Sequence, residues 1–308
     1  MSCPGAVLGS PIWFQWEDTA GPHRNARGDR AADLLSSRMA RFKLLIEYAG
    51  TRYSGWQIQK NARTVAGEIE RAVFEATGRR EFELYGSGRT DAGVHAIGQV
   101  AHLDIYTDLP PELLRRKIND QLPADIHLRA ATKAPHKFHA RHDAVERSYL
   151  YQISTRRTAF GKPFVWWIRE PLSVDQMRDA ARAFVGLQNF DAFTDDDPEE
   201  KSTKVLVDAV EIVEAGALIL IRVRGSHFLW KMVRRMVGVL AAVGRGEIDA
   251  RSAARFLEPS PMQEPSRKSD ARTTPAALTA PAAGLFLEAV RYKGDAQLGQ
   301  LTPLLRIS

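Results

Sequence analysis

The segment YGSGRTDAGVHAIGQVAH, residues 85–102, joins a glycine-rich turn to an alternating, strand-like run. Within the turn, Asp91 lies two residues after Arg89. Because a neighbouring opposite charge favours the ionised form of a carboxylate, this spacing predicts a pKa of Asp91 below its ordinary value. The glycines of the segment are expected to allow left-handed backbone or a close approach by another group, which residues with a Cβ resist. They are Gly86, Gly88 and Gly93.

Two interpretations of Asp91 compete. One is that Asp91 only closes a surface turn with its side chain, as Asp commonly does. The other rests on the longer run GRTDAGVHA, residues 88–96, followed by GQV. This run resembles the active-site segment of the pseudouridine synthases, in particular the tRNA pseudouridine synthase A family, and it is far more specific than a short glycine pattern. In that family the Asp of RTDAGVH is catalytic, so the resemblance implies that role for Asp91.

Two further segments match that family in the same order along the chain. In RSYLY, residues 147–151, Tyr149 and Tyr151 share one face of an expected strand. The resemblance places Tyr149 against the target base and leaves Tyr151 structural, whereas core packing of both rings is the competing interpretation. In HFLWKMVRRMVG, residues 227–238, the family has an Arg that pairs with the catalytic Asp, which the resemblance assigns to Arg234.

The same segment predicts a helix over about residues 228–243, because its apolar residues recur at helical spacing. The residues expected to face the core are Leu229, Met232, Val233, Met236 and Val237. Lys231 and Arg235 lie off this stripe, where a solvent-exposed position is the default. The sequence does not decide whether Lys231 and Arg235 are solvent-exposed.

Three more basic residues are assigned to the RNA by the resemblance. Arg89 is expected to help displace the target nucleotide from the RNA stack, with a phosphate contact or a turn salt bridge as the alternative. The segment KFHAR, residues 137–141, borders the RNA-binding cleft in the family. Its Lys137 and Arg141 are therefore expected to neutralise phosphates, which strengthens binding without reading sequence.

The composition is that of an ordinary globular chain of 308 residues, 44% hydrophobic and 26% charged. An excess of 43 Lys and Arg over 37 Asp and Glu gives a net charge of +6, which favours a polyanionic partner. The single cysteine, Cys3, excludes a disulfide framework, and a reducing cytoplasm fits best. No metal or cofactor is expected, because His95 and His102 have no recognised ligand spacing.

The resemblance implies a uridine isomerase that acts on tRNA at positions 38 to 40 of the anticodon arm. Two other functions compete with this interpretation. A non-catalytic RNA-binding or RNA-folding module on the same scaffold is the alternative, favoured by the basic balance and the aromatic strand. A carboxylate-dependent glycosidase would need a second acid in a comparable setting, which the sequence lacks. The acidic run DDDPEE, residues 195–200, is expected to point to solvent or to contribute little to RNA binding.

Periodicity predicts an α+β chain in two halves. Residues 1–38 carry no sustained pattern and read as a disordered or non-native extension, with Met39 as a more natural start. Residues 39–140 and 141–308 each read as a split βαβ unit of the ferredoxin or RRM-like type. The resemblance implies the pseudouridine synthase fold, in which the halves share a mixed, mainly antiparallel sheet with a central cleft. It also implies a homodimer that holds one tRNA across two subunits.

Local signals place several element ends. Thr64 is expected to cap a helix that ends at Gly78, and Ser173 with Gln176 predicts a capping box. A hairpin is expected about residues 215–216. The Pro, Ser and Ala-rich residues 259–283 read as a linker or loop before a last strand.

Overall fold

One mixed sheet of ten strands runs through the described part of this computed structural model, residues 39–197, 202–258, 273–305 and 307. Its main path follows the order β4-β1-β3-β10-β5-β9-β8-β7, while β2 pairs with β3 and β6 with β5. The extension predicted over residues 1–38 and most of the predicted linker, residues 259–272, lie outside the described residues. No helix in the described ranges is long and apolar enough to span a membrane.

The first half of the sheet has the strand order β4-β1-β3-β2, and every neighbouring pair in it is antiparallel. Its elements are β1 (Ala40–Tyr48), α2 (Val65–Thr77), β2 (Phe82–Gly86), β3 (His95–Ile105), α3 (Pro111–Asn119) and β4 (Ile126–Lys133), with a 3-10 turn η1 (Gly50–Arg52). Two βαβ units therefore interleave, which is the predicted split βαβ arrangement.

The second half repeats this order as β10-β5-β9-β8, again with antiparallel neighbours. Its main elements are β5 (Ala144–Ser154), α4 (Val174–Ala181), β8 (Lys204–Ala215), β9 (Leu218–Gly225), α5 (Met232–Gly244) and β10 (Leu285–Tyr292). Short elements accompany them, namely η2 (Lys162–Phe164), β6 (Trp166–Trp167), η3 (Arg182–Phe184), β7 (Gly186–Asn189), η4 (Asp191–Phe193), α6 (Ser252–Arg255) and η6 (Ala282–Gly284). The predicted α+β class with a mainly antiparallel sheet is confirmed, whereas the domain boundary at residue 140 stays a prediction.

The sheet forks at β3. Along one edge β3 pairs with β1, and along the other it first pairs in parallel with β10, where Leu287 lies opposite Ala96. From Ala101 onward the same edge pairs with β2 instead. The loop of residues 87–94, which connects β2 to β3, therefore leaves the sheet between β2 and β10. Residues 85–102 therefore supply both this loop and much of the strand β3, which lies where the two halves meet.

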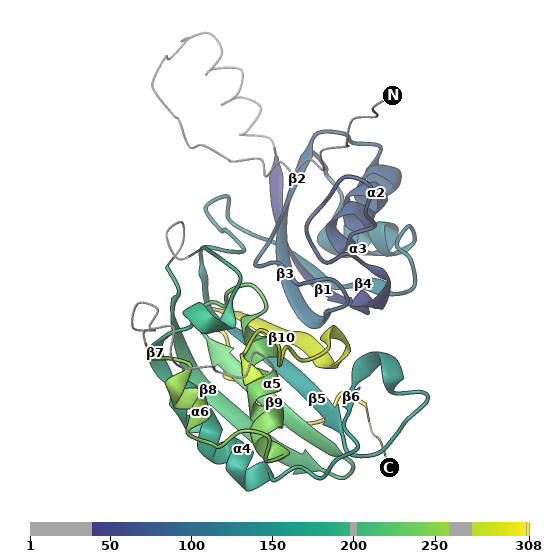
Figure 1. Cartoon of the computed structure of the whole chain (residues 1–308). Helices are drawn as coiled ribbons and strands as arrows, with labels where there is room; N and C mark the ends of the chain where they lie inside the picture. Colours follow the sequence, from purple (N-terminus) through teal and green to yellow (C-terminus); the bar gives the residue numbers. More distant parts are fainter. Residues whose placement is uncertain (1–38, 198–201, 259–272, 306, 308) are drawn as a thin grey trace, which may run out of the picture. The chain divides into compact units, whose positions relative to one another are not determined.

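Helices α2 and α3 lie in the first half and α4 and α5 in the second (Figure 1). Each half has its own hydrophobic core, to which its helices contribute. Helices α2 and α3 bury Ile69, Leu114 and Ile118 against the first half, and α4 and α5 bury Met177 and Met236 against the second. Tyr149 of β5 packs against both cores. It therefore lies where the two halves meet.

The helix α2 begins and ends at the predicted caps. The hydroxyl Oγ1 of Thr64 accepts a hydrogen bond from the N–H of Gly67 at 3.3 Å, and Gly78 has the left-handed φ of 68° expected after a helix. The hairpin between β8 and β9 is also confirmed, with Gly216 at φ 62°. Helix α3 ends at Asn119.

One predicted helix start is right but lacks its predicted cap, and a second is wrong. Helix α4 begins at Val174, directly after Ser173, as predicted. The side chain of Ser173 makes no capping bond to α4. Instead, the N–H of Ser173 donates to the carbonyl of Gly244 at 2.8 Å, so this turn is fixed by the end of α5. Helix α5 begins at Met232 and not near residue 228, because Lys231 has a left-handed φ of 60° that no helix continues.

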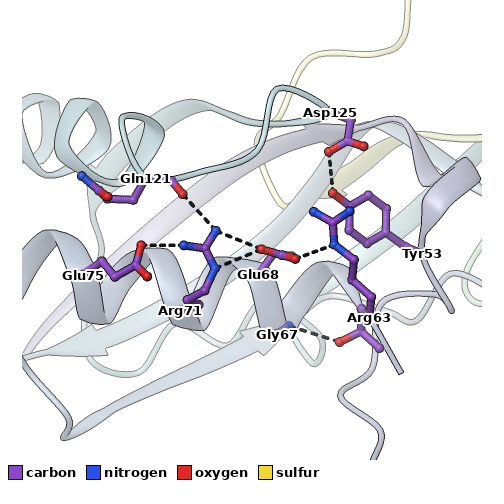
Figure 2. Close-up of polar contacts among 9 residues, drawn as sticks. Tyr53, Arg63, Gly67, Glu68, Arg71, Glu75, Gln121 and Asp125 are labelled. Carbon is purple, nitrogen blue, oxygen red and sulfur yellow. Dashed lines mark hydrogen bonds and ion pairs between the residues drawn. The ribbon is translucent and has the colours of Figure 1, made fainter. Parts of the chain in front are cut away.

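A charged network ties α2 to its surroundings, as Figure 2 shows. The carboxylate of Glu68 accepts a hydrogen bond from Nε of Arg63 at 2.6 Å and another from Nη2 of Arg71 at 2.9 Å. Arg71 also donates to the carbonyl of Gln121 at 3.0 Å, which joins α2 to the end of α3. Burial alone would raise the pKa of Glu68, but the bonds from the two arginines outweigh it and lower the pKa.

Replacing Glu68 with Gln is expected to lower the free energy of unfolding by about 0.5 kcal/mol at neutral pH, because the ion pairs lie near the surface. Since the folded-state pKa of Glu68 is depressed, this stabilisation is present above the ordinary pKa of 4.5 and lost as pH falls through the folded value. Urea unfolding of both proteins across this range measures the difference. A difference that grows toward acid pH would contradict the network's role.

Candidate active site

The turn that carries Asp91 is closed by backbone and not by the Asp side chain. The N–H of Val94 donates to the carbonyl of Asp91 at 3.1 Å. The preceding Thr90 is fixed on two sides, since its carbonyl accepts from the N–H of Trp56 at 3.1 Å and its hydroxyl lies 2.8 Å from the hydroxyl of Tyr48. The carboxylate of Asp91 is therefore not used to close the turn.

The three glycines of the segment meet different demands. Gly93 has a left-handed φ of 78°, and a Cβ on Gly86 would lie 2.6 Å from the indole ring of Trp56. Both therefore need glycine, as predicted. Gly88 has an ordinary φ and no heavy atom within 4 Å of where a Cβ would be, so the expectation of a special need there is wrong.

Asp91 lies beside an arginine from the other half of the fold. Its Oδ2 is 3.6 Å from Nη1 of Arg234, and the side chains are 23% and 18% exposed, respectively. Nε of Arg234 donates to the carbonyl of Ala280 at 2.8 Å, which fixes the guanidinium. Such a planar, permanently charged group suits a partly buried pair with a carboxylate.

Burial raises the pKa of Asp91 above its ordinary value, although Arg234 and, more weakly, Lys231 act to lower it. The predicted depression of this pKa by Arg89 is therefore wrong. Arg89 is exposed, and the cation that acts most on Asp91 comes from a distant part of the sequence. Proximity along the chain did not translate into proximity of the two charges.

Tyr149 and Tyr151 have the different settings that the resemblance implies. Tyr149 is half-buried, and its ring lies edge-on to Phe228 with centroids 5.3 Å apart. Burial raises the pKa of Tyr149, and the charges of Tyr48 and Asp91 raise it further, so its ring lies within electrostatic reach of the carboxylate. Tyr151 is fully buried and donates its hydroxyl to the carbonyl of Pro281 at 2.8 Å.

The acidic run begins beside the start of α5, where Asp195 and Asp197 remain exposed as expected but Asp195 is also paired with two cations. Its small contribution to RNA binding stays a prediction. Asp195 accepts a hydrogen bond from Nζ of Lys231 at 2.8 Å and a second from Nη2 of Arg235. Asp196 accepts from the N–H of Trp230 at 3.1 Å and raises the pKa of Asp91. Arg235 is only 4% exposed, so the default of a solvent-exposed position is wrong for it. The end of the run, residues 198–200, lies outside the described residues.

The remaining predicted RNA contacts are exposed. Arg89, Lys137 and Arg141 all present their side chains to solvent. The loop of residues 137–143 is shaped by His139, whose Nδ1 accepts from the N–H groups of Arg141 and His142. These exposed cations leave phosphate contacts open, and their roles stay predictions.

The two histidines considered for a metal have backbone partners. Nδ1 of His95 accepts from the N–H of Gly50 at 3.0 Å, and its Nε2 lies 2.9 Å from the carbonyl of Pro163. Nδ1 of His102 accepts from the N–H of Ala140 at 3.1 Å. Both rings thus fix loops around the sheet. In the part of the chain that the structure describes, no three His, Cys, Asp or Glu side chains group as a metal site requires.

A family model described as tRNA pseudouridine synthase matches residues 44–143 and 180–293. The tRNA pseudouridine synthase A of Geobacter sp. (strain M21) is 38% identical over 256 residues, covering 82% of this chain and 99% of the relative. The protein of the same name from Rhodopseudomonas palustris (strain BisA53) is 38% identical over 258 residues, covering 83% and 100%. This chain belongs to the tRNA pseudouridine synthase family. The matched stretches contain Asp91 and Arg234, whereas Tyr149 lies between them.

Within this tRNA pseudouridine synthase, the structure adds residues to the site that sequence reasoning missed. Phe228 packs on Tyr149, and Asp195 fixes the approach to α5. Arg147 donates to carbonyls of three separate loops. Phe228 and Arg147 stand inside segments that match the family, which is the signal that could have drawn attention to them. For Asp195 the sequence argued against a role in the site, because acidic runs usually face solvent.

Replacing Asp195 with Ala is expected to lower the free energy of unfolding by about 1–3 kcal/mol, because the buried guanidinium of Arg235 then lacks its charged acceptor. The matched control is Asp175→Ala, since Asp175 pairs with Arg178 at 2.8 Å but is 91% exposed. That variant is expected to lose less than about 0.5 kcal/mol. Denaturant unfolding compares the two, and equal losses would contradict the structural role of Asp195.

Proposed function

We propose that this chain isomerises uridine to pseudouridine in the anticodon arm of tRNA, with Asp91 as the reacting carboxylate. The observation that carries the proposal is the pair of Asp91 and Arg234, which two distant segments bring to 3.6 Å. Tyr149 adds an aromatic ring within electrostatic reach of the same carboxylate. The family to which the chain belongs supports the substrate class.

The reaction breaks the bond between the ribose C1′ and N1 of uracil and forms a bond between C1′ and C5. The hydrogen on C5 is lost to solvent and N1 gains a proton, so no oxidant, reductant or hydrolytic water is consumed. Asp91 serves as nucleophile or base in this sequence. Arg234 keeps the carboxylate available in its ionised form, because it opposes the effect of burial on the pKa.

Substrate binding falls to the aromatic and cationic groups around this pair. Stacking on Tyr149 would hold a base that has left its own stack, an interaction worth about 1–3 kcal/mol. Arg89 is proposed to help displace the target nucleotide, and Lys137 and Arg141 to contact phosphates. We also propose that the protein works as a homodimer that holds one tRNA across two subunits, in a reducing cytoplasm. A monomer observed by light scattering would contradict the dimer.

The experiment is tritium release from unmodified tRNA labelled at C5 of uridine, measured beside tRNA binding by the same preparation. The proposal expects both tight binding and release that rises with time. Tight binding without release would favour the alternative, a non-catalytic RNA-binding or RNA-folding module. Release without any dependence on Asp91 would contradict the assignment of the reacting carboxylate.

A further inference from the structure

One partly buried guanidinium joins three loops around the site. Arg147 lies in β5, two residues before Tyr149. Its Nη1 donates to the carbonyls of Ser226 at 2.7 Å and Ala144 at 3.1 Å. Its Nη2 donates to the carbonyls of Arg141 at 2.7 Å and Ser87 at 3.2 Å. Four hydrogen bonds from one side chain thus end on backbone.

Three of these four carbonyls belong to loops that carry or lead to a proposed site residue, and the fourth, that of Ala144, lies at the start of β5 itself. Ser87 begins the loop that leads to Asp91. Arg141 is itself a proposed phosphate contact. Ser226 precedes the stretch that leads through Phe228 to Arg234. Arg147 donates to backbone carbonyls and not to side chains. Its guanidinium therefore fixes the path of the three loops whatever side chains they carry.

Among the residues that the structure describes, the Arg147 guanidinium meets these carbonyls and forms no ion pair with a carboxylate. Burial lowers the pKa of Arg147, and the groups that act on it besides burial are Tyr292, Tyr149 and Arg141. Arg222, a more deeply buried arginine of the sheet, is instead paired with Glu288 at 2.7 Å. A guanidinium stays protonated in proteins and has five donors in a planar fork, so it can serve four carbonyls at once. A lysine ammonium has only three donors on one nitrogen and cannot span them.

We propose that Arg147 is a positioning residue for the reaction. It holds three segments in one fixed geometry: the loop from Ser87 to Asp91, the loop that contains Arg141, and the stretch from Ser226 to Arg234. This inference rests on the proposed function for its effect on rate. It extends that function, because it gives the arginine of the RSYLY segment a role that does not involve the RNA directly.

The test compares Arg147→Met and Arg147→Lys with the wild type. The control is Arg291→Met, since Arg291 is 13% exposed and donates to the carbonyl of Ala296 at 3.0 Å and to Glu146, away from the three loops. Four quantities are measured, namely thermal stability, tRNA Kd, the single-turnover rate at saturating tRNA, and amide hydrogen exchange in residues 86–90 and 139–144.

Both Arg147 variants are expected to react about 100-fold more slowly at saturating tRNA, because small misplacements of reacting groups cost that much. Their tRNA Kd changes little, and exchange in the two named segments becomes about 10-fold faster, as expected for locally loosened loops. Arg291→Met keeps the wild-type rate and exchange in those segments. The loss of thermal stability in Arg291→Met measures how much an arginine with a purely structural role contributes to stability.

A rate restored by Arg147→Lys would overturn the proposal, since charge alone would then suffice. So would wild-type rate and exchange in Arg147→Met. If the wild type itself forms no pseudouridine, the proposed function fails, whereas the exchange measurement still decides the inference. In that case faster exchange confined to the named segments supports the positioning role, and unchanged exchange overturns it.

Discussion

Replacing Asp91 with Asn is expected to lower the single-turnover rate of pseudouridine formation by about 10⁴-fold, the upper range for a single positioned acid–base group. The amide keeps the shape of the side chain, but it carries no negative charge and neither attacks carbon nor accepts a proton at neutral pH. Binding of tRNA is expected to change little, because the exposed cations remain. Quenched-flow or manual sampling of saturated complexes measures the rate directly.

This loss is expected without unfolding. Burial raises the folded-state pKa of Asp91 above its ordinary value of 3.8. The stability linked to its protonation is therefore present below pH 3.8 and lost as pH rises through the folded value, so the ionised side chain weighs against folding at neutral pH. Asp91→Asn is expected to melt no lower than the wild type. A folded variant that kept full turnover would exclude Asp91 as the reacting group.

Replacing Arg234 with Met is expected to slow the reaction by about 10²-fold at neutral pH and to change its pH dependence, because a preorganised charge beside the reacting group is lost. Burial raises the pKa of Asp91 and Arg234 opposes this effect more than any other group. Without Arg234, the pKa of Asp91 rises further. Because the proposed reaction needs the ionised carboxylate, activity is expected to disappear at a higher pH than in the wild type as acid is added.

The pH–rate profile at saturating tRNA measures this shift of the acid limb. Lys231→Met is the matched control, because Lys231 also lowers the pKa of Asp91 but less than Arg234 does. A smaller shift in the same direction is expected for it. Arg234→Lys keeps the charge and is expected to shift the limb least. An acid limb that stays in place or moves to lower pH in Arg234→Met would rule out this electrostatic role.

The strands and the first helix could be predicted from sequence because their signals are local. Alternation in β1 and the caps of α2 at Thr64 and Gly78 depend on neighbouring residues alone. The start of α5 could not be predicted in this way. There Asp196 takes the N–H of Trp230 and Lys231 adopts a left-handed conformation, so a contact across the fold decides where the helix begins.

The candidate site divides along the same line. The resemblance to the family assigns Asp91, Tyr149 and Arg234 to the site, and the structure brings them to one place where the two halves meet. The influence of Arg89 was inferred from spacing and proved wrong, since the turn points the two side chains to different surroundings. The segment around Arg147 resembles the family and so draws attention to it, but its hydrogen bonds could not be predicted, because its partners are backbone carbonyls that every residue possesses.

The most direct measurement is to map pseudouridine at single-nucleotide resolution in unmodified tRNA after incubation with the purified protein and, separately, with Asp91→Asn. Pseudouridine at positions 38 to 40 with the wild type and none with the variant is the predicted result. A wild-type preparation that binds the tRNA but leaves every uridine unchanged would contradict the account.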